Sequence, residues 1–171
     1  SDIPDLLTDE LREQLRTVST ATLAHQLQMR GIRGTFLTGL KPTHPEMRMI
    51  GRARTLRYVA LREDQIQRFQ KGVNAQKRAA EGIEPGDILV IEARNVPDAG
   101  TIGDIYVSRV HARGGVGVIT DGALRDTPAI AGIPICVYHQ SSHASTYGRH
   151  HMPYSTDDCI TCAGVFVEPG D

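Results

Sequence analysis

The chain has 171 residues, of which 40% are hydrophobic and 23% charged, and its formal net charge is −1. This length suits one domain, and this composition excludes an intrinsically disordered chain. The near-neutral charge and the absence of tryptophan disfavour a nucleic-acid partner, and no apolar run is long enough to span a membrane.

The order of apolar residues, β-formers and glycine or proline breaks predicts an α/β fold with some parallel strand pairing. The elements expected in chain order are helices over 5–16 and 19–30, a loop over 32–50, a strand over 52–61, a solvated helix over 63–81, a strand over 87–93, a loop over 94–103, a helix over 104–113, a strand over 116–120, a short segment over 125–131, a strand over 134–138, a polar loop over 139–157 and a strand over 159–168.

These elements predict a single domain over residues 1–171, with N-terminal helices over 5–30 and a core over 52–168. The final residues, Glu-Pro-Gly-Asp over 168–171, read as a turn that leads into a further strand. We therefore expect a C-terminal part to be truncated or missing.

The three cysteines are Cys136, Cys159 and Cys162. Because their number is odd and no secretory signal is visible, we expect reduced thiols and a cytoplasmic location.

Chemistry-bearing residues gather in the stretch 100–126. Gly100 and Gly103 flank the start of a predicted helix, where free backbone N–H groups suit a small anion such as a carboxylate. Asp104 lies in the first turn of that helix, and twenty residues separate it from the pair Arg125-Asp126. The intervening strand returns the chain to the same end of the sheet, so these side chains can converge. Asp126 suits a hard divalent cation, Arg125 a carboxylate or enolate oxygen, and Asp104 a water that carries a proton.

Each of these residues also has a purely structural interpretation. Asp104 by itself is the ordinary partner of a helix dipole, and Arg125-Asp126 by itself is an ordinary exposed turn or ion pair. Spacing alone leaves both interpretations open.

Three stretches carry a family resemblance: GDILVIEA, GDIYVSRVHARGGVGVITDGALRD and PICVY. Over about 85–138 they resemble the RraA-like family, which includes regulators of ribonuclease activity A and metal-dependent 4-hydroxy-4-methyl-2-oxoglutarate aldolases. The aldolases carry an Asp, twenty residues and then Arg-Asp, and Asp104, Arg125 and Asp126 match that spacing without a gap.

The resemblance implies a swivelling α/β/α domain with a central mixed sheet, assembled as a homotrimer or a dimer of trimers with active sites between subunits. It implies that Asp126 and waters hold Mg²⁺ or Mn²⁺. The backbone of Gly103, Asp104 and Ile105, together with Arg125, would bind the pyruvyl end of the substrate. Arg125 and Asp104 would be catalytic, with Asp104 placing the water that protonates the pyruvate enolate.

The implied activity is cleavage of 4-hydroxy-2-oxo acids to pyruvate, with decarboxylation of oxaloacetate as a second reaction. The alternative implied by the same family is a non-catalytic regulator that masks a ribonuclease or an RNA helicase. Two features differ from the aldolases. His25 stands where many relatives have an acidic residue, and the C-terminal region that can supply an acidic residue to the neighbouring subunit is not represented.

The lysines provide a separate argument about mechanism. A Schiff-base aldolase needs a desolvated lysine, and the three lysines, Lys41, Lys71 and Lys77, all fall in a loop or on a polar helix. An aldolase with this sequence therefore needs a metal as its electron sink.

A second cluster of potential ligands is formed by His139, His143, His150 and His151, followed by the pair Cys159 and Cys162. A single CxxC is weak evidence for zinc, so we expect loop histidines near the rim of a pocket, with His139 and His143 as candidates to reach the distal group of the substrate.

Three arginines occur on the predicted strand 52–61. Arg52 and Arg54 share one face of an alternating strand and Arg57 does not. We expect a solvated or intersubunit face here in preference to an RNA site.

Overall fold

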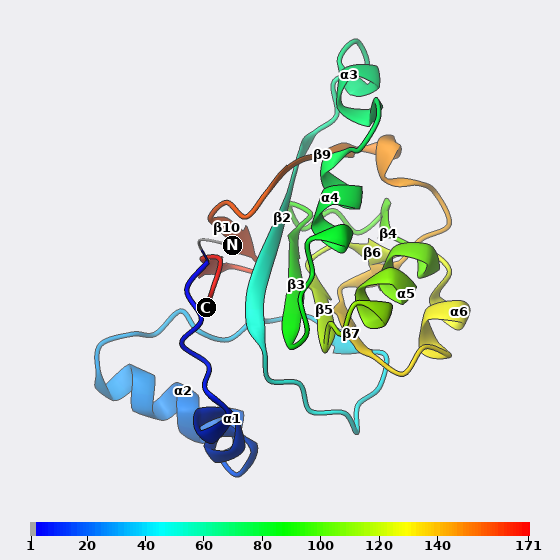
Figure 1. Ribbon diagram of the computed structural model, residues 1–171. Coiled ribbons are helices and arrows are strands. Elements are labelled where there is room, and N and C mark those ends of the chain that lie inside the picture. Colours follow the sequence, from blue (N-terminus) through cyan, green and yellow to red (C-terminus); the bar gives the residue numbers. More distant parts are fainter. Residues whose placement is uncertain (1–2) are drawn as a thin grey trace.

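A six-stranded mixed sheet forms the centre of the structure, with the strand order β1-β7-β5-β3-β2-β9 (Figure 1). The computed structural model describes residues 3–171. Strands β2, β3, β5 and β7 pair in parallel, whereas β1 and β9 form antiparallel edges. The predicted α/β class and the mixed sheet are therefore confirmed. The strands of this sheet are β1 (Lys41–Pro42), β2 (Arg52–Ala60), β3 (Asp87–Glu92), β5 (Gly117–Thr120), β7 (Cys136–His139) and β9 (His151–Thr156).

Helices and two smaller sheets complete the fold. A three-stranded parallel sheet has the order β4-β6-β8, and β10 and β11 form a hairpin. No described helix has the length and apolar character needed to cross a membrane. The remaining elements are α1 (Asp9–Arg16), α2 (Thr20–Met29), α3 (Ile66–Gln70), α4 (Ala75–Glu81), β4 (Gly100–Ile102), α5 (Asp104–Ala112), β6 (Ala123–Leu124), α6 (Thr127–Ala131), β8 (Ser141–Ser142), the 3-10 helix η1 (Tyr147–Arg149), β10 (Ile160–Cys162) and β11 (Val165–Val167).

The central sheet is buried on both faces, and its inner strands β3, β5 and β7 are accordingly rich in apolar residues. Successive side chains of a strand point to opposite faces, and β3 shows the consequence directly. Leu89 and Ile91 belong to the core beneath α4 and α5, whereas Ile88 and Val90 belong to a second core beneath the β10–β11 hairpin. Figure 1 shows α4, α5 and α6 together along one side of the sheet.

The two N-terminal helices lie beside the sheet and bury none of their side chains (Figure 1). Thr8 and Ser19 cap them by accepting a backbone hydrogen bond three residues further on, which confirms both predicted helix starts to within a few residues. Arginines hold the pair to the rest of the chain. Arg12 donates to the carbonyl of Ile50 at 2.8 Å, and Arg48 donates to carbonyls at the end of α1.

The prediction of one solvated helix over 63–81 is wrong. The chain forms α3, breaks at Gly72 with a φ of +64°, and then forms α4. Helix α4 packs on the sheet through Ala75, Ala79 and Ala80. Alanines bury too little apolar area to stand out in an amphipathic pattern, and this explains the error.

Three segments expected to lack regular structure, or to form one strand, are organised differently. The predicted polar loop 139–157 contains β8, η1 and β9, and the predicted loop 94–103 ends in β4. The single strand expected over 159–168 is a hairpin whose turn has positive φ at both Ala163 and Gly164, as a tight hairpin turn requires. Downstream, Gly170 donates to the carbonyl of Ala53, so the final residues lie along β2.

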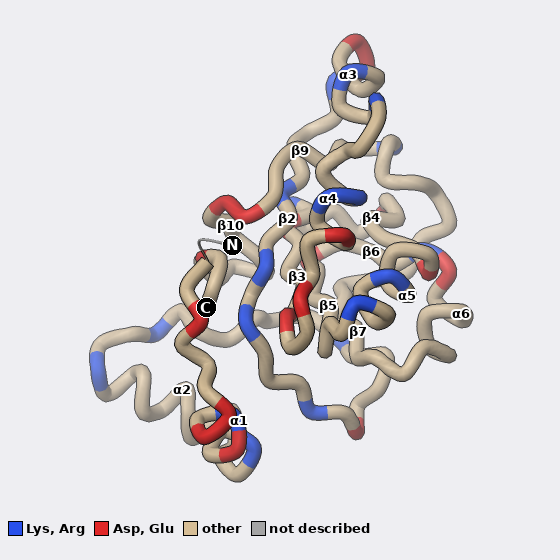
Figure 2. The backbone as a smooth tube through the Cα atoms, in the orientation of Figure 1, with Lys and Arg blue, Asp and Glu red and all other residues tan. Residues whose placement is uncertain are grey.

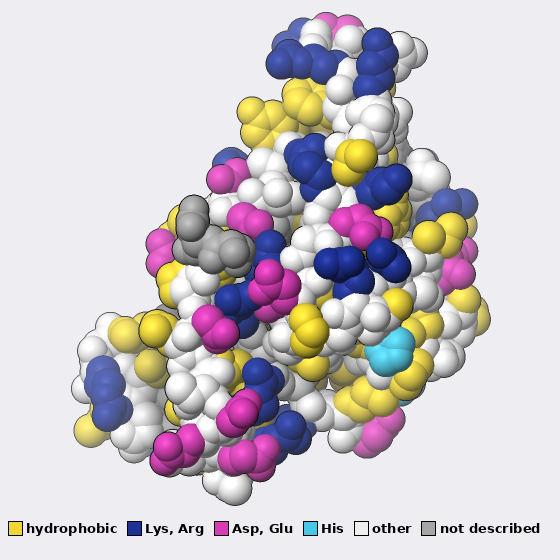
Figure 3. Space-filling view, in the orientation of Figure 1, with side chains coloured by type: hydrophobic (Ala, Val, Ile, Leu, Met, Phe, Trp, Pro, Cys, Tyr) yellow, Lys and Arg dark blue, Asp and Glu magenta, His cyan; other side chains and the backbone are white. Residues whose placement is uncertain are grey.

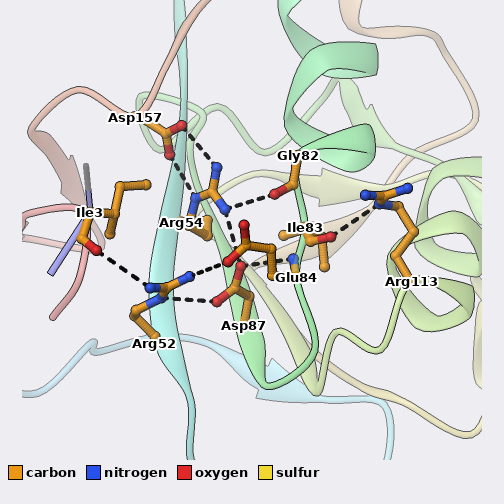
Figure 4. Close-up of polar contacts among 9 residues, drawn as sticks. All are labelled: Ile3, Arg52, Arg54, Gly82, Ile83, Glu84, Asp87, Arg113 and Asp157. Atoms are coloured by element: carbon orange, nitrogen blue, oxygen red, sulfur yellow. Dashed lines mark hydrogen bonds and ion pairs between the residues drawn. The ribbon is translucent and has the colours of Figure 1, made fainter. Parts of the chain in front are cut away.

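Arg52 and Arg54 do share a face, but that face is buried, so the expectation of a solvated or intersubunit surface is wrong. In Figure 4 both guanidinium groups converge on Asp87 at the start of β3. Arg52 Nε lies 3.1 Å from Asp87 Oδ1 and Arg54 Nη1 lies 3.2 Å from Oδ2, while Arg54 also forms a two-pronged pair with Asp157. Figure 2 shows blue stretches on β2 beside red stretches on β3, where the two strands run side by side. Only Arg57 is exposed among the three arginines.

We predict that Asp87→Ala lowers the free energy of unfolding by about 3–5 kcal/mol, because it leaves two buried guanidinium groups without their shared carboxylate. Urea denaturation followed by circular dichroism measures this loss. The control is Asp64→Ala, which removes the exposed partner of Arg62 and should leave stability unchanged. Equal stability of the two variants would contradict a structural role for the cluster.

Candidate functional site

Parallel pairing of β4 and β6 brings the two predicted site segments together. Gly100 lies opposite Ala123 and Ile102 opposite Leu124, and the N–H of Arg125 donates to the carbonyl of Ile102 at 2.9 Å. Since α5 follows β4 and α6 follows β6, the two helices begin next to each other at the same end of this small sheet.

Asp126 lies directly against the start of α5. Its Oδ2 atom is 2.9 Å from the position that a Cβ atom on Gly103 would occupy, which is closer than ordinary van der Waals contact. Asp126 adopts a left-handed conformation, with φ 54° and ψ 38°, and this conformation ends β6 and begins α6. A glycine at 103 therefore gives the carboxylate access to the backbone at the N-terminus of α5.

Free donors are available at the same place. Gly103 is the N-cap of α5 and provides no side chain to accept hydrogen bonds. The first intrahelical bond runs from Val107 to Gly103, so the N–H groups of Asp104 and Ile105 have no partner within the helix. Together with the helix dipole, they form a cradle for a carboxylate or an enolate oxygen.

Arg125 extends over the neighbouring loop with its guanidinium exposed. Its Nε donates to the carbonyl of Ala144 at 3.0 Å, while Nη1 and Nη2 have no protein partner within residues 3–171. The stem of Arg125 runs across Gly100, where a Cβ would lie 2.8 Å from Arg125 Cγ and 3.1 Å from the carbonyl of His143. The loop thus fixes the direction of the arginine and leaves its two terminal nitrogens free to form a fork with an anion.

A buried network of hydrogen bonds from β2 and α4 holds β4 in place. Tyr58 donates from its hydroxyl to the carbonyl of Thr101 at 2.9 Å, and Gln76 Nε2 donates to both the Tyr58 hydroxyl and the Thr101 carbonyl. Complete burial raises the pKa of Tyr58 well above its usual value, so this hydroxyl remains a donor. The network ties β2, α4 and β4 together, and sequence analysis missed it because Tyr58 and Gln76 read as ordinary strand and helix residues.

The carboxylates suit a hydrated hard cation. Asp126 is exposed and Asp104 half-buried, and neither carboxylate accepts a hydrogen bond from any residue that the structure describes. Within residues 3–171 no group of three or more His, Cys, Asp or Glu side chains is arranged to enclose a metal. Mg²⁺ is commonly held by one or two carboxylates while it keeps several waters, so the oxygen donors at Asp126 fit Mg²⁺ or Mn²⁺.

The histidines and cysteines do not form a second site. His139 and His151 are buried in β7 and β9, not at a pocket rim, and burial lowers the pKa of His151 to about 4. His150 lies on the surface and pairs with Asp98 at 2.9 Å. Cys162 is buried, and burial strongly raises the pKa of its thiol, which opposes the thiolate that zinc requires.

His143 is the one member of the histidine group that lies beside the candidate site. The backbone N–H of His143 donates to the carbonyl of Leu124, directly before Arg125. The ring atom Nδ1 accepts a hydrogen bond from the backbone N–H of Ser145 at 3.1 Å. Because Nδ1 is an acceptor, the neutral ring carries its proton on Nε2.

Comparison with known proteins identifies the family. The sequence profile described as "RraA-like: Aldolase/RraA" matches residues 18–171. The chain belongs to the RraA-like family. It is 26% identical over 164 residues to a Halalkalibacterium halodurans protein named "Putative 4-hydroxy-4-methyl-2-oxoglutarate aldolase", covering 92% of this chain and 69% of the relative.

Solved structures agree with this assignment. RraAS2 of Streptomyces coelicolor, described as an unusual member of the RNase ES inhibitor RraA protein family, aligns with a TM-score of 0.86 and 28% identity over 100% of this chain and 81% of its own. The RNA-processing inhibitor RraA from Thermus thermophilis aligns with a TM-score of 0.63 and 22% identity, over 90% of this chain and 84% of its own, which shows a shared fold. The RraA-like fold predicted from the sequence is confirmed.

We predict that Gly103→Ala preserves the fold but weakens divalent-metal binding, because the new methyl group displaces the flexible Asp126 carboxylate. Calorimetric titration with Mn²⁺ measures the affinity, and thermal unfolding checks the fold. Gly34→Ala is the matched control, since nothing lies within 4 Å of its added Cβ. Unchanged Mn²⁺ affinity in Gly103→Ala would contradict the placement of the metal at Asp126.

Proposed function

We propose that this RraA-like protein is a divalent-metal-dependent lyase that cleaves 4-hydroxy-2-oxo acids to pyruvate and also decarboxylates oxaloacetate. One observation carries the proposal: the free N–H groups at the start of α5, the Asp126 carboxylate and the unpaired end of Arg125 meet at the edge where β4 and β6 end. A masking surface does not need this combination of anion cradle, hard ligand and guanidinium. The H. halodurans relative is named for a substrate of this class.

Each residue has a distinct role in the proposed reaction. The backbone N–H groups of Asp104 and Ile105 bind the pyruvyl carboxylate. Arg125 binds the oxygen that gains negative charge as the C–C bond breaks, which is the position where a preorganised donor accelerates the reaction most. As the C3–C4 bond breaks, the 4-hydroxyl becomes the carbonyl of the second product and releases its proton to water. Asp104 orients the water that returns a proton to the methylene carbon of the pyruvate enolate.

Asp126 and waters would hold the metal ion, and a bound divalent ion supplies Lewis acidity toward the 2-oxo group. Amine catalysis is poorly supported by this chain, because Lys41, Lys71 and Lys77 are all exposed and none is desolvated enough to be a Schiff-base nucleophile.

A second candidate function is a non-catalytic regulator that binds and masks a ribonuclease or an RNA helicase. The high structural similarity to S. coelicolor RraAS2, a relative described by its link to RNase ES inhibition, favours this candidate. Turnover distinguishes the two functions. If the protein is a regulator, it releases no pyruvate from any 4-hydroxy-2-oxo acid or from oxaloacetate, with Mg²⁺ or with chelator. If it is a lyase, it releases pyruvate with Mg²⁺, and chelator abolishes this release.

If the protein is a lyase, we predict that substitutions at the three site residues cause different defects in metal binding and turnover. Asp126→Ala should abolish metal binding and cleavage. Arg125→Lys should keep the metal but lose about a hundredfold in kcat, because lysine cannot form the fork. Asp104→Asn should keep the metal and slow proton transfer by roughly 10²–10⁴.

Pyruvate release, with Mn²⁺ calorimetry alongside, tests this pattern. Asp158→Ala and Arg33→Lys are controls, since both are exposed and their side chains contact no described residue through hydrogen bonds or ion pairs. Wild-type metal affinity and turnover in Asp126→Ala would make this assignment of the active site wrong.

We also propose that the protein is a homo-oligomer, with a trimer or a dimer of trimers as the expected form. Helices α1 and α2 bury no side chain within their own chain, and Met29, Ile32 and Phe36 are largely exposed nearby. These apolar side chains are suited to contacts with another copy. Sedimentation velocity should show a species well above 18.7 kDa at micromolar concentration. A monomer alone would refute the assembly.

A further inference from the structure

A groove of about 510 Å³ lies between α4 and α5, next to the candidate site. Ile105 lines it, and this residue is 76% exposed although its backbone N–H belongs to the anion cradle. The groove and the cradle therefore share a wall. A substrate whose pyruvyl end occupies the cradle can place its other end in the groove.

The direction of the helices determines which end of the groove meets the site. α4 and α5 each connect one parallel strand of the central sheet to the next, so both run opposite to the strands and parallel to each other. Glu81 pairs with Arg109 across the groove. One turn earlier on each helix are Lys77 and Ile105, so Lys77 lies at the end of the groove where α5 begins.

Among the charged side chains that line the groove, one cation has no anionic partner within the described residues. Arg109 binds both carboxylate oxygens of Glu81, at 2.8 and 2.9 Å, and Arg113 approaches the same group at 3.7 Å. This pairing lowers the pKa of Glu81, so its charge is present and already neutralised. Lys77 lines the same groove and forms no ion pair with any residue from 3 to 171. Figure 3 shows dark blue side chains on both sides of a magenta one over α4 and α5.

We propose that Lys77 binds the distal carboxylate of the substrate and sets the preference for 2-oxo acids that carry a second carboxylate. This role rests on the proposed function, which places the pyruvyl end at Asp104 and Ile105. Axes of packed helices lie about 8–10 Å apart, a gap that one lysine side chain crosses, so its ammonium can follow substrates of different length. Lys77 is thus a specificity residue and not a nucleophile.

The test compares two substrates that differ only at the distal end: 4-hydroxy-2-oxoglutarate, which has a carboxylate there, and 4-hydroxy-2-oxopentanoate, which has a methyl group. Lys77→Met should lower kcat/KM for the diacid by roughly ten- to a hundredfold through KM, the range expected for one charge-assisted hydrogen bond, and leave the monoacid unchanged. Lys77→Arg should restore part of the loss. Lys71→Met, a change at an exposed lysine that does not line the groove, is the matched control.

Calorimetry with Mg²⁺ and the non-cleavable pair 2-oxoglutarate and 2-oxopentanoate provides a readout that does not need turnover. The wild type should bind 2-oxoglutarate more tightly, and Lys77→Met should remove the difference. An equal loss for both ligands, or no loss for the diacid, would overturn the role of Lys77 and leave the proposed cleavage standing. If the wild type releases no pyruvate from either substrate, the proposed function fails, and the binding comparison alone then decides whether Lys77 reads the distal carboxylate.

Discussion

Parallel pairing of β2, β3, β5 and β7 is the constraint on which the rest of the structure depends. A parallel pair cannot be closed by a tight turn, so each connection crosses over one face of the sheet and includes a helix. All these crossovers leave from the carboxyl ends of the strands, where ligands generally bind in open α/β sheets. The short strands β4 and β6 follow β3 and β5 along the chain, pair in a separate small sheet and lead directly into α5 and α6. The site and the groove beside it are consequences of this one arrangement.

Close approach is the second requirement of the site. Gly100 and Gly103 allow Arg125 and Asp126 to lie against the backbone of β4 and the start of α5. The opposite side of β4 is held by the Thr101 carbonyl, which accepts two buried hydrogen bonds. A backbone fixed in this way keeps its free N–H groups in place before any ligand arrives, and such preorganisation is the main source of electrostatic stabilisation in enzymes.

The buried pairing of Arg52 and Arg54 with Asp87 has a related structural role. It joins the first residues of β2 and β3 to the turn that ends α4, so α4 cannot shift relative to the sheet without separating buried charges. The position of α4 in turn determines where Lys77 and Glu81 lie relative to α5. The charge cluster at the amino ends of β2 and β3 thereby fixes the position of α4, which forms one wall of the groove beside α5.

The sequence by itself determined the α/β class and the helices of the N-terminus, because these depend on local signals, and it also predicted a candidate site at Asp104, Arg125 and Asp126. The spacing of Asp104 from Arg125-Asp126, and the glycines before them, are visible without coordinates. Only the tertiary structure decided that Arg52 and Arg54 are buried, since a strand shows which residues share a face but not what covers that face. It also decided the place of Lys77, which reads as a solvated lysine until α4 packs beside α5. Pairings between residues far apart in the chain depend on how layers pack, and no local pattern encodes them.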